Sequence, residues 1–165
     1  MRFYRMAAIA ALAITAACAR TTGGPNGDSV DMTVGLNRQT AMQTARTQLV
    51  HHGFTVTGIG DEMLVTSPKA VPEYLREVST AKQSSGQTWF LVVESSDVRF
   101  FRGTRLRVSG YLMPAGSGTA QAVRNGKRAE QNAIPITQQN PRLFREVEAV
   151  AGWIESGAQL KKKQK

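Results

Sequence analysis

The sequence predicts an α+β protein, a two-layer sandwich in which two helices pack on one face of an antiparallel sheet of about four or five strands. Two segments of the chain have apolar residues at spacings of three and four, which is typical of amphipathic helices. Between them, β-branched and aromatic residues form strand-like runs separated by short turns. Because short turns join antiparallel strands, we expect one antiparallel sheet within a single domain over residues 35–157.

The first helix is predicted over residues 36–53. Asn37 is a favourable N-cap residue, and Gly53 suits the position just after the last turn, where φ is often positive. The apolar face of this helix comprises Ala41, Met42, Ala45, Leu49 and Val50.

The strands are predicted between the two helices. Residues 54–67 have the alternation of a β-hairpin, with its turn at 58–62. Residues 68–86 form a connection whose sequence permits a short helix. The strongest strand pattern covers residues 88–113, with a bend or bulge expected at 95–97. In its second half, an inward set alternates with an outward set: Leu106, Val108, Gly110 and Leu112 against Arg105, Arg107, Ser109 and Tyr111.

The second helix is predicted over residues 140–157, after a mobile loop at 114–131, in which a small hairpin closed by Asn125-Gly126 is the alternative. Asn140 caps it, Pro141 occupies the first helical position and Gly157 ends it. Residues 158–165 are expected to be a disordered basic tail. The apolar stripe of this helix comprises Leu143, Phe144, Val147, Val150, Ala151 and Ile154.

The N-terminal residues have the pattern of an export signal. Arg2 and Arg5 precede a twelve-residue, nearly continuous apolar run at residues 6–17, and Cys18, the only cysteine of the chain, follows it. The run is too short to span a bilayer, which needs about 20 residues. Residues 1–17 are therefore predicted to be a signal peptide, with ordinary secretion and a mitochondrial presequence as alternatives.

The residues Thr15-Ala16-Ala17-Cys18 resemble the lipobox of bacterial lipoproteins, with Thr15 where an aliphatic residue is usual. In that family the cysteine thiol receives a diacylglyceryl group, cleavage makes the cysteine the first residue, and its amine is often acylated by a fatty acid such as palmitate. The resemblance implies a lipid anchor at Cys18. Ala19 after it implies sorting to the outer membrane, with the domain facing the periplasm. Residues 18–34, rich in turn-forming residues, are predicted to be the lipidated cysteine and a flexible tether.

No catalytic or metal-binding set emerges from the sequence. The neighbouring His51 and His52 project about 100° apart on a helix and cannot chelate one ion well, whereas a helix C-terminus accommodates them. The pair Asp61 and Glu62 lies at a predicted turn. We therefore expect no enzyme activity, no cofactor and no metal.

A basic surface remains, in a chain with a net charge of +9. Arg105, Arg107 and Tyr111 share one strand face by the two-residue period, and arginine suits bidentate contacts to phosphate or carboxylate. With Arg99, they are the candidate anion- or partner-binding residues; the alternative is a solvated sheet face. The sequence contains no nucleic-acid-binding motif. The positive residues of this region are Arg99, Arg102, Arg105, Arg107, Arg124, Lys127 and Arg128.

The order of elements is also similar to that of small helix-on-sheet modules of bacterial envelope lipoproteins, including those of outer-membrane protein and lipopolysaccharide assembly. This resemblance implies a membrane-anchored, non-catalytic accessory or scaffold module of an envelope protein complex. One alternative is a binding module for an anionic envelope ligand, such as lipopolysaccharide, phospholipid or a wall polymer. A small envelope hydrolase is a further alternative.

Overall fold

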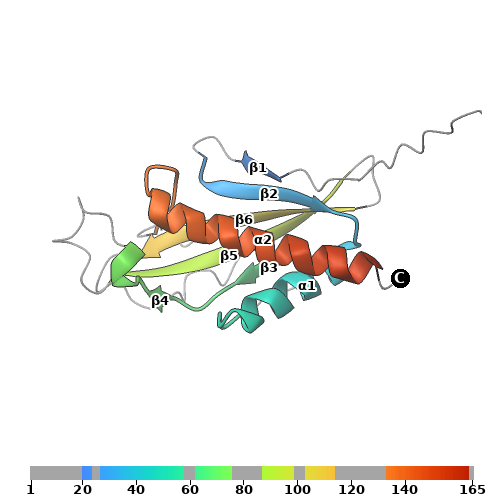
Figure 1. Ribbon diagram of the computed structural model, residues 1–165, viewed down its shortest axis with the longest axis horizontal. Helices are drawn as coiled ribbons and strands as arrows, with labels where there is room; N and C mark the ends of the chain where they lie inside the picture. The colour runs from blue at the N-terminus through green and yellow to red at the C-terminus, as the bar shows by residue number, and fades with distance from the viewer. Residues whose placement is uncertain are drawn as a thin grey trace, which may run out of the picture.

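The computed structural model is a two-layer α+β sandwich, which confirms the predicted fold class (Figure 1). Helices α1 (Arg38–His51) and α2 (Pro141–Lys163) lie on the same face of the sheet. α2 packs along β2 and β6, while α1 packs on β3, β5 and β6. The structure describes residues 20–23, 27–57, 62–75, 87–98, 103–113 and 133–163.

Within these residues, seven strands, rather than the four or five predicted, form one antiparallel sheet in the order β1-β2-β6-β5-β3, with β4 paired to β5 and β7 paired to β6. The ten-residue strands β5 and β6 pair along their whole length. The early strand β2 lies against the late strand β6. The strands are β1 (Arg20–Gly23), β2 (Ser29–Val34), β3 (Met63–Val65), β4 (Lys69–Ala70), β5 (Thr88–Asp97), β6 (Thr104–Met113) and β7 (Ile134–Pro135).

The prediction of a flexible tether over residues 18–34 is wrong, because β1 and β2 lie within that stretch. Val30, Met32 and Val34 are at most 1% exposed and pack beneath the helices. They alternate with side chains that point to the other face, as a half-buried strand requires. The alternation of inward and outward side chains covers only six residues and is preceded by turn-forming residues, so the sequence pattern did not indicate a strand. The domain therefore begins before the predicted boundary at residue 35.

Helix α1 begins and ends as predicted. The side-chain oxygen of Asn37 accepts a hydrogen bond from the backbone N–H of Thr40 at 2.9 Å, as an N-cap does. Gly53 has a φ of +75°, and the N–H of Phe54 donates to the carbonyl of Leu49 at 2.9 Å. This is a Schellman ending, which leaves the chain directed toward the sheet.

The predicted hairpin at residues 54–67 is only partly formed. Val56 makes one bridge to Thr66, whereas β3 takes its main pairing from β5. The predicted turn at 58–62 lies outside the described residues except for Glu62.

Strand β5 stays in unbroken register with β6 through residues 95–97, so the predicted interruption by a bend or bulge is wrong. A single 3₁₀ turn, η1 (Glu73–Leu75), occupies the connection where the sequence permits a short helix. The predicted loop at 114–131 lies outside the described residues.

Helix α2 has the predicted apolar stripe, and its six residues are all buried. It continues past Gly157 to Lys163, so the predicted helix end at Gly157 is wrong, as is the predicted tail for residues 158–163. A Cβ on Gly157 would lie 2.7 Å from the side-chain nitrogen of Gln48 on α1. Glycine here permits the close approach of two helices, and packing of Ala158 carries the helix onward.

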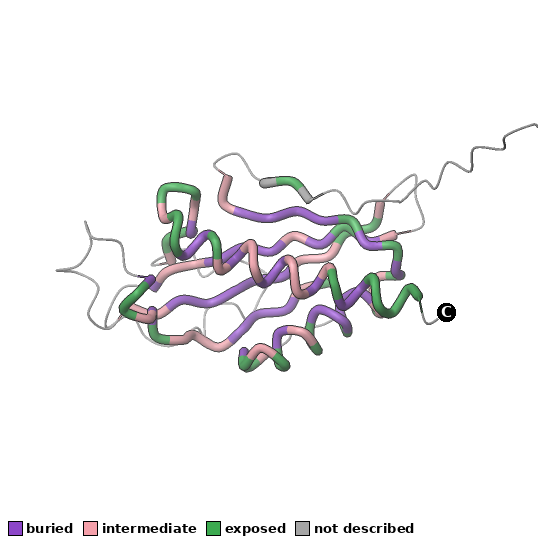
Figure 2. The backbone as a smooth tube through the Cα atoms, in the orientation of Figure 1, coloured by how far each residue is buried: buried purple, intermediate pink, exposed green. Residues whose placement is uncertain are grey.

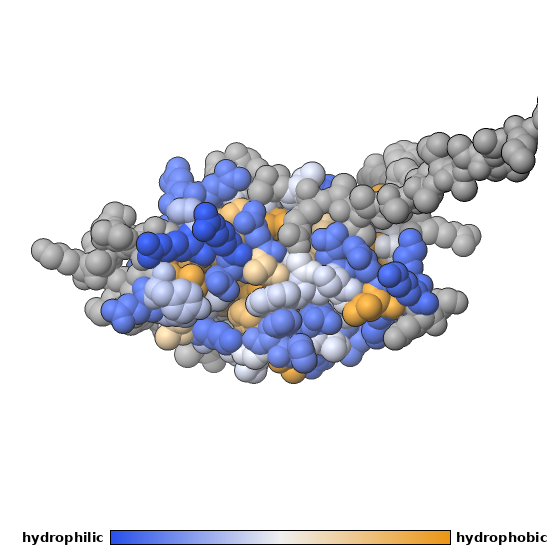
Figure 3. Space-filling view, viewed as in Figure 1, coloured by the Kyte–Doolittle hydropathy of each residue, from blue (hydrophilic) through white to orange (hydrophobic). Residues whose placement is uncertain are grey.

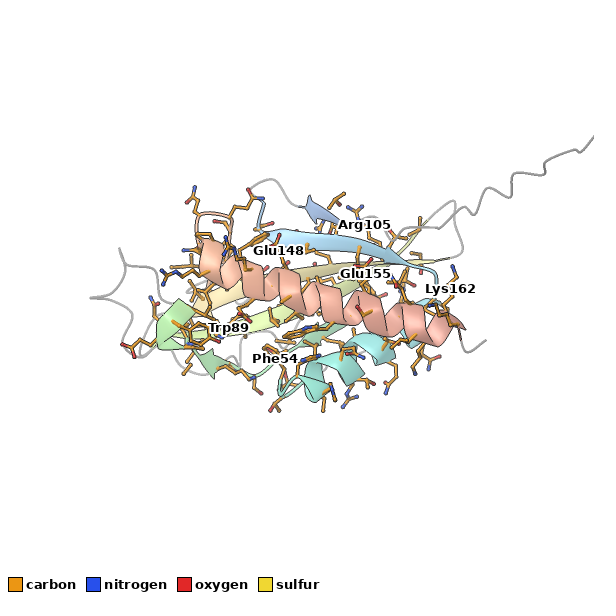
Figure 4. All side chains as sticks on the ribbon, in the orientation of Figure 1. Phe54, Trp89, Arg105, Glu148, Glu155 and Lys162 are labelled. Carbon is orange, nitrogen blue, oxygen red and sulfur yellow. The ribbon has the colours of Figure 1, made fainter. Side chains whose placement is uncertain are left out.

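The main core lies between the sheet and the two helices, where buried segments of the strands face the helices (Figure 2). At one side, Phe54 and Trp89 meet edge to face with ring centroids 5.8 Å apart (Figure 4). A second, smaller cluster forms on the opposite face of the sheet, so that face is not polar throughout. Its buried members are Val65, Phe90, Val92 and Met113.

Truncating Met32 tests the corrected boundary. Met32→Ala should lower the free energy of unfolding by about 2–5 kcal/mol, because it leaves a cavity under the helices. Thr33→Ala, at the exposed neighbouring position, should change it by less than about 0.5 kcal/mol. Denaturant titration of both variants measures the difference, and equal, small effects would mean that this segment does not pack.

Candidate functional site

The candidate site lies on the face of the sheet opposite the helices. Asp31 of β2, Arg107 of β6 and Glu94 of β5 are directly opposite one another in the strand register. The next rung places Arg105 between Thr33 and Ser96. Because Leu106 and Val108 of β6 face the core, the arginines between and beside them face outward.

Asp31 binds both arginines. Its side chain is only 4% exposed, whereas those of Arg105 and Arg107 are 51% and 39% exposed. One carboxylate oxygen accepts a hydrogen bond from Arg105 at 2.5 Å, and the other accepts one from Nε of Arg107 at 2.9 Å. These charge-assisted bonds satisfy a carboxylate that the sheet removes from water.

Strand β1 closes the remaining side of this carboxylate. A Cβ on Gly23 would lie 2.3 Å from an Asp31 oxygen, so only glycine permits β1 to approach so closely. Burial by itself raises the pKa of Asp31. Hydrogen bonds from Arg107 and Arg105, together with their charges, outweigh burial and hold the pKa below its ordinary value of 3.8. The same hydrogen bond raises the pKa of Arg107.

An open groove of about 430 Å³ lies beside this cluster. Its charges are mixed, since Glu94 attracts Arg107 across the ladder and Glu62 binds Arg38 at 2.8 Å. An incoming anion would therefore compete with Asp31 and meet two further carboxylates. The groove is lined by Glu62, Met63, Glu94, Ser95, Ser96, Arg105 and Arg107.

The structure brings together only part of the predicted site. Arg105 and Arg107 are adjacent, as the two-residue period predicts. Tyr111 instead joins the smaller apolar cluster and stacks on Phe90, with centroids 5.4 Å apart. Arg99 and Cys18 lie outside the described residues.

Sequence reasoning missed Asp31, the residue that organises the site, because its segment was taken for a tether. The alternation of Val30, Met32 and Val34 with polar residues was the signal that could have found it.

The two histidines lie elsewhere, at the end of α1 on the helix side. His52 is the C-cap residue and stacks on Trp153 of α2, with ring centroids 3.7 Å apart and planes 8° apart. His51 meets His52 edge to face. The described residues contain no group of three or more His, Cys, Asp or Glu side chains placed to hold a metal ion. The observed role of His52 is a packing contact between the helices.

Removing the charge of Asp31 should destabilise the fold in a pH-dependent manner. At neutral pH, Asp31→Asn should lower the free energy of unfolding by about 1–3 kcal/mol, because the charge-assisted hydrogen bonds are lost while the half-exposed arginines can still reach water. Since the folded pKa lies below the unfolded one, the carboxylate stabilises the fold above about pH 4, and this stabilisation is lost as the pH falls through the folded pKa. The difference between variant and wild type should therefore shrink in acid, as measured by denaturant titration at several pH values.

Asp97 supplies the matched control. It also pairs with an arginine, Arg38, but its side chain is 70% exposed. Asp97→Asn should change the free energy of unfolding by less than about 1 kcal/mol. Equal losses in the two variants, or an Asp31→Asn effect that persists unchanged in acid, would contradict the role given to Asp31.

Comparison of the sequence with family models and curated proteins does not assign this chain to a family. Among the described residues, no helix combines the length and apolar character needed to cross a bilayer. No protein-family model matches the chain, and no curated protein matches it significantly.

Proposed function

We propose that this chain is a lipid-anchored protein of the bacterial outer membrane that faces the periplasm and acts without catalysis, as an accessory or scaffold module in envelope assembly. The sequence supports the location: a basic start, a short apolar run and Ala16-Ala17-Cys18 have the form of a lipoprotein signal. The structure supplies a folded α+β domain that begins close behind that cysteine.

The groove beside Arg105 and Arg107 is the proposed binding surface for a protein partner. The observation that supports this proposal is the shared use of Asp31 by the two arginines, which leaves their outer sides exposed, while Asp31 and Glu94 together balance their two positive charges. With Glu94 on the same rung, the surface offers donors and acceptors of both signs. Such mixed polar surfaces fit protein interfaces, where complementary charges set the orientation of the partner.

The anionic-ligand alternative receives less support at this groove. A polyanion needs uncompensated positive charge, and here each exposed guanidinium already faces a carboxylate. Both histidines of the chain lie on the helix side, remote from the serines of the groove. A hydrolytic site would therefore need a different base.

A photo-crosslinking residue at Ser96 tests the binding surface. Ser96 is exposed in the groove, whereas Gln43 is exposed on α1, on the opposite layer. In cells, the Ser96 position should capture a discrete envelope protein that the Gln43 position does not capture. Glu94→Arg should abolish this crosslink, because it reverses one charge of the groove.

The matched charge reversal is Glu148→Arg on α2, outside the groove (Figure 4), which should leave the Ser96 crosslink intact. Crosslinks of equal yield at Ser96 and Gln43, or a Ser96 crosslink that survives Glu94→Arg, would reject the groove as the interface.

The anchor is tested by Cys18→Ala. Since Cys18 is the only cysteine, this variant should lose all thiol-linked lipid and appear in the soluble fraction or as an uncleaved precursor. Mass measurement of the membrane-extracted wild type should show the added acyl groups. An unmodified wild type, or a Cys18→Ala variant processed and membrane-bound like the wild type, would reject the anchor.

A further inference from the structure

Strand β1 leaves very little chain between the proposed anchor and the folded domain. It begins at Arg20, two residues after Cys18. Two residues of extended chain span at most about 7 Å. If Cys18 is lipidated, as the proposed function holds, the edge of the sheet is therefore kept close to the membrane surface, and the domain cannot stand away from it on a tether.

The C-terminal end of α2 lies at this same end of the domain. Arg20 pairs with Met32, and β2 ends two residues later at Val34. A Cβ on the next residue, Gly35, would lie 3.7 Å from the side-chain nitrogen of Lys162. Figure 1 shows the end of β2 and the end of α2 side by side.

This end of α2 carries a concentrated positive charge. Lys161, Lys162 and Lys163 are consecutive and exposed, and residues on a helix project about 100° apart, so they present charge around the helix end. None of the three forms an ion pair with a described residue. The carboxylates of Asp97 and Glu62 both bind Arg38.

An exposed apolar side chain accompanies the lysines. Leu160 is 63% exposed, one of the few large apolar side chains that the described surface presents to solvent. Figure 3 shows an apolar spot bordered by hydrophilic residues over this part of α2. Lysines favour the C-terminus of any helix through its dipole, but that effect gives no reason to expose a leucine beside them. An apolar residue beside lysines is instead typical of surfaces that lie on anionic lipid.

We propose that the end of α2 from Leu160 to Lys163 docks on the anionic lipid surface in which Cys18 is anchored. The inference rests on the lipid anchor, and it adds a second contact and a fixed orientation. Lipid and lysines then hold the domain at two points. α2 has 23 residues and is about 35 Å long. In the proposed orientation the axis of α2 points away from the membrane, which places its N-terminal end several Debye lengths, each about 8 Å, from the charged surface.

A depth measurement on the lipidated full chain tests this orientation. Because Cys18 carries lipid and is the only native cysteine, Leu160→Cys provides a single free thiol for a fluorescent label. Gln139→Cys, exposed just before α2, is the matched control at the far end. In phosphatidylcholine vesicles that contain phosphatidylglycerol and a lipid-bound quencher, the label at 160 should be quenched and the label at 139 should not.

The charge contribution is separated by replacing Lys161, Lys162 and Lys163 with Gln in the Leu160→Cys chain. Most of the quenching should be lost in this variant, in vesicles of phosphatidylcholine alone, and at high salt. Quenching at 160 that survives the three substitutions, equal quenching at 160 and 139, or no quenching at 160 would overturn the docking proposal. The mass of the vesicle-bound chain distinguishes the two failures: a chain without acyl groups refutes the anchor, whereas an acylated chain without contact at 160 refutes only the docking.

Discussion

The pairing of β2 with β6 is the interaction on which the rest of this structure depends. It connects a strand near the N-terminus to one more than seventy residues later, as the pairing of Asp31 with Arg107 illustrates. On one face it places Val30, Met32 and Val34 beneath α2. On the other face it brings a carboxylate to two arginines. Without this pairing the helices would lack part of their packing surface, and the arginines would lack their shared partner.

The buried charge of Asp31 alters what the exposed arginines Arg105 and Arg107 can bind. Arg105 and Arg107, considered as isolated side chains, suggest an anion site. The side chain of Asp31 between them is only 4% exposed, and an ion pair is stronger when it is removed from water. Both guanidinium groups are therefore held by Asp31 and are less available to an external anion. Closure by Gly23 on β1 is part of the same arrangement. The result is a nearly neutral polar surface, which supports the proposed protein partner rather than a polyanion.

Among the described residues, the end of α2 carries positive charge that no carboxylate balances. There, the lysines lie next to the start of the sheet and have no carboxylate partner among the described residues. The molecule thus separates a balanced polar groove on the sheet from a basic helix end. In the proposed orientation, the helix end and the lipid on Cys18 hold the domain to the membrane, and the groove is left to a protein partner.

The sequence by itself determined the fold class, helix α1 with both of its ends, and the buried stripe of α2. These features are encoded locally, by apolar periodicity and by capping residues such as Asn37 and Gly53. Only the tertiary structure decided that residues 29–34 form a strand between β1 and β6, because a single strand of six residues acquires its stability from its neighbours. It also decided that Gly157 lies inside a helix, at a point where the side chain of Gln48 on α1 approaches too closely for a larger residue. The candidate site was predictable only in its arginines, which share a strand, whereas Asp31 joins them through contacts distant in sequence.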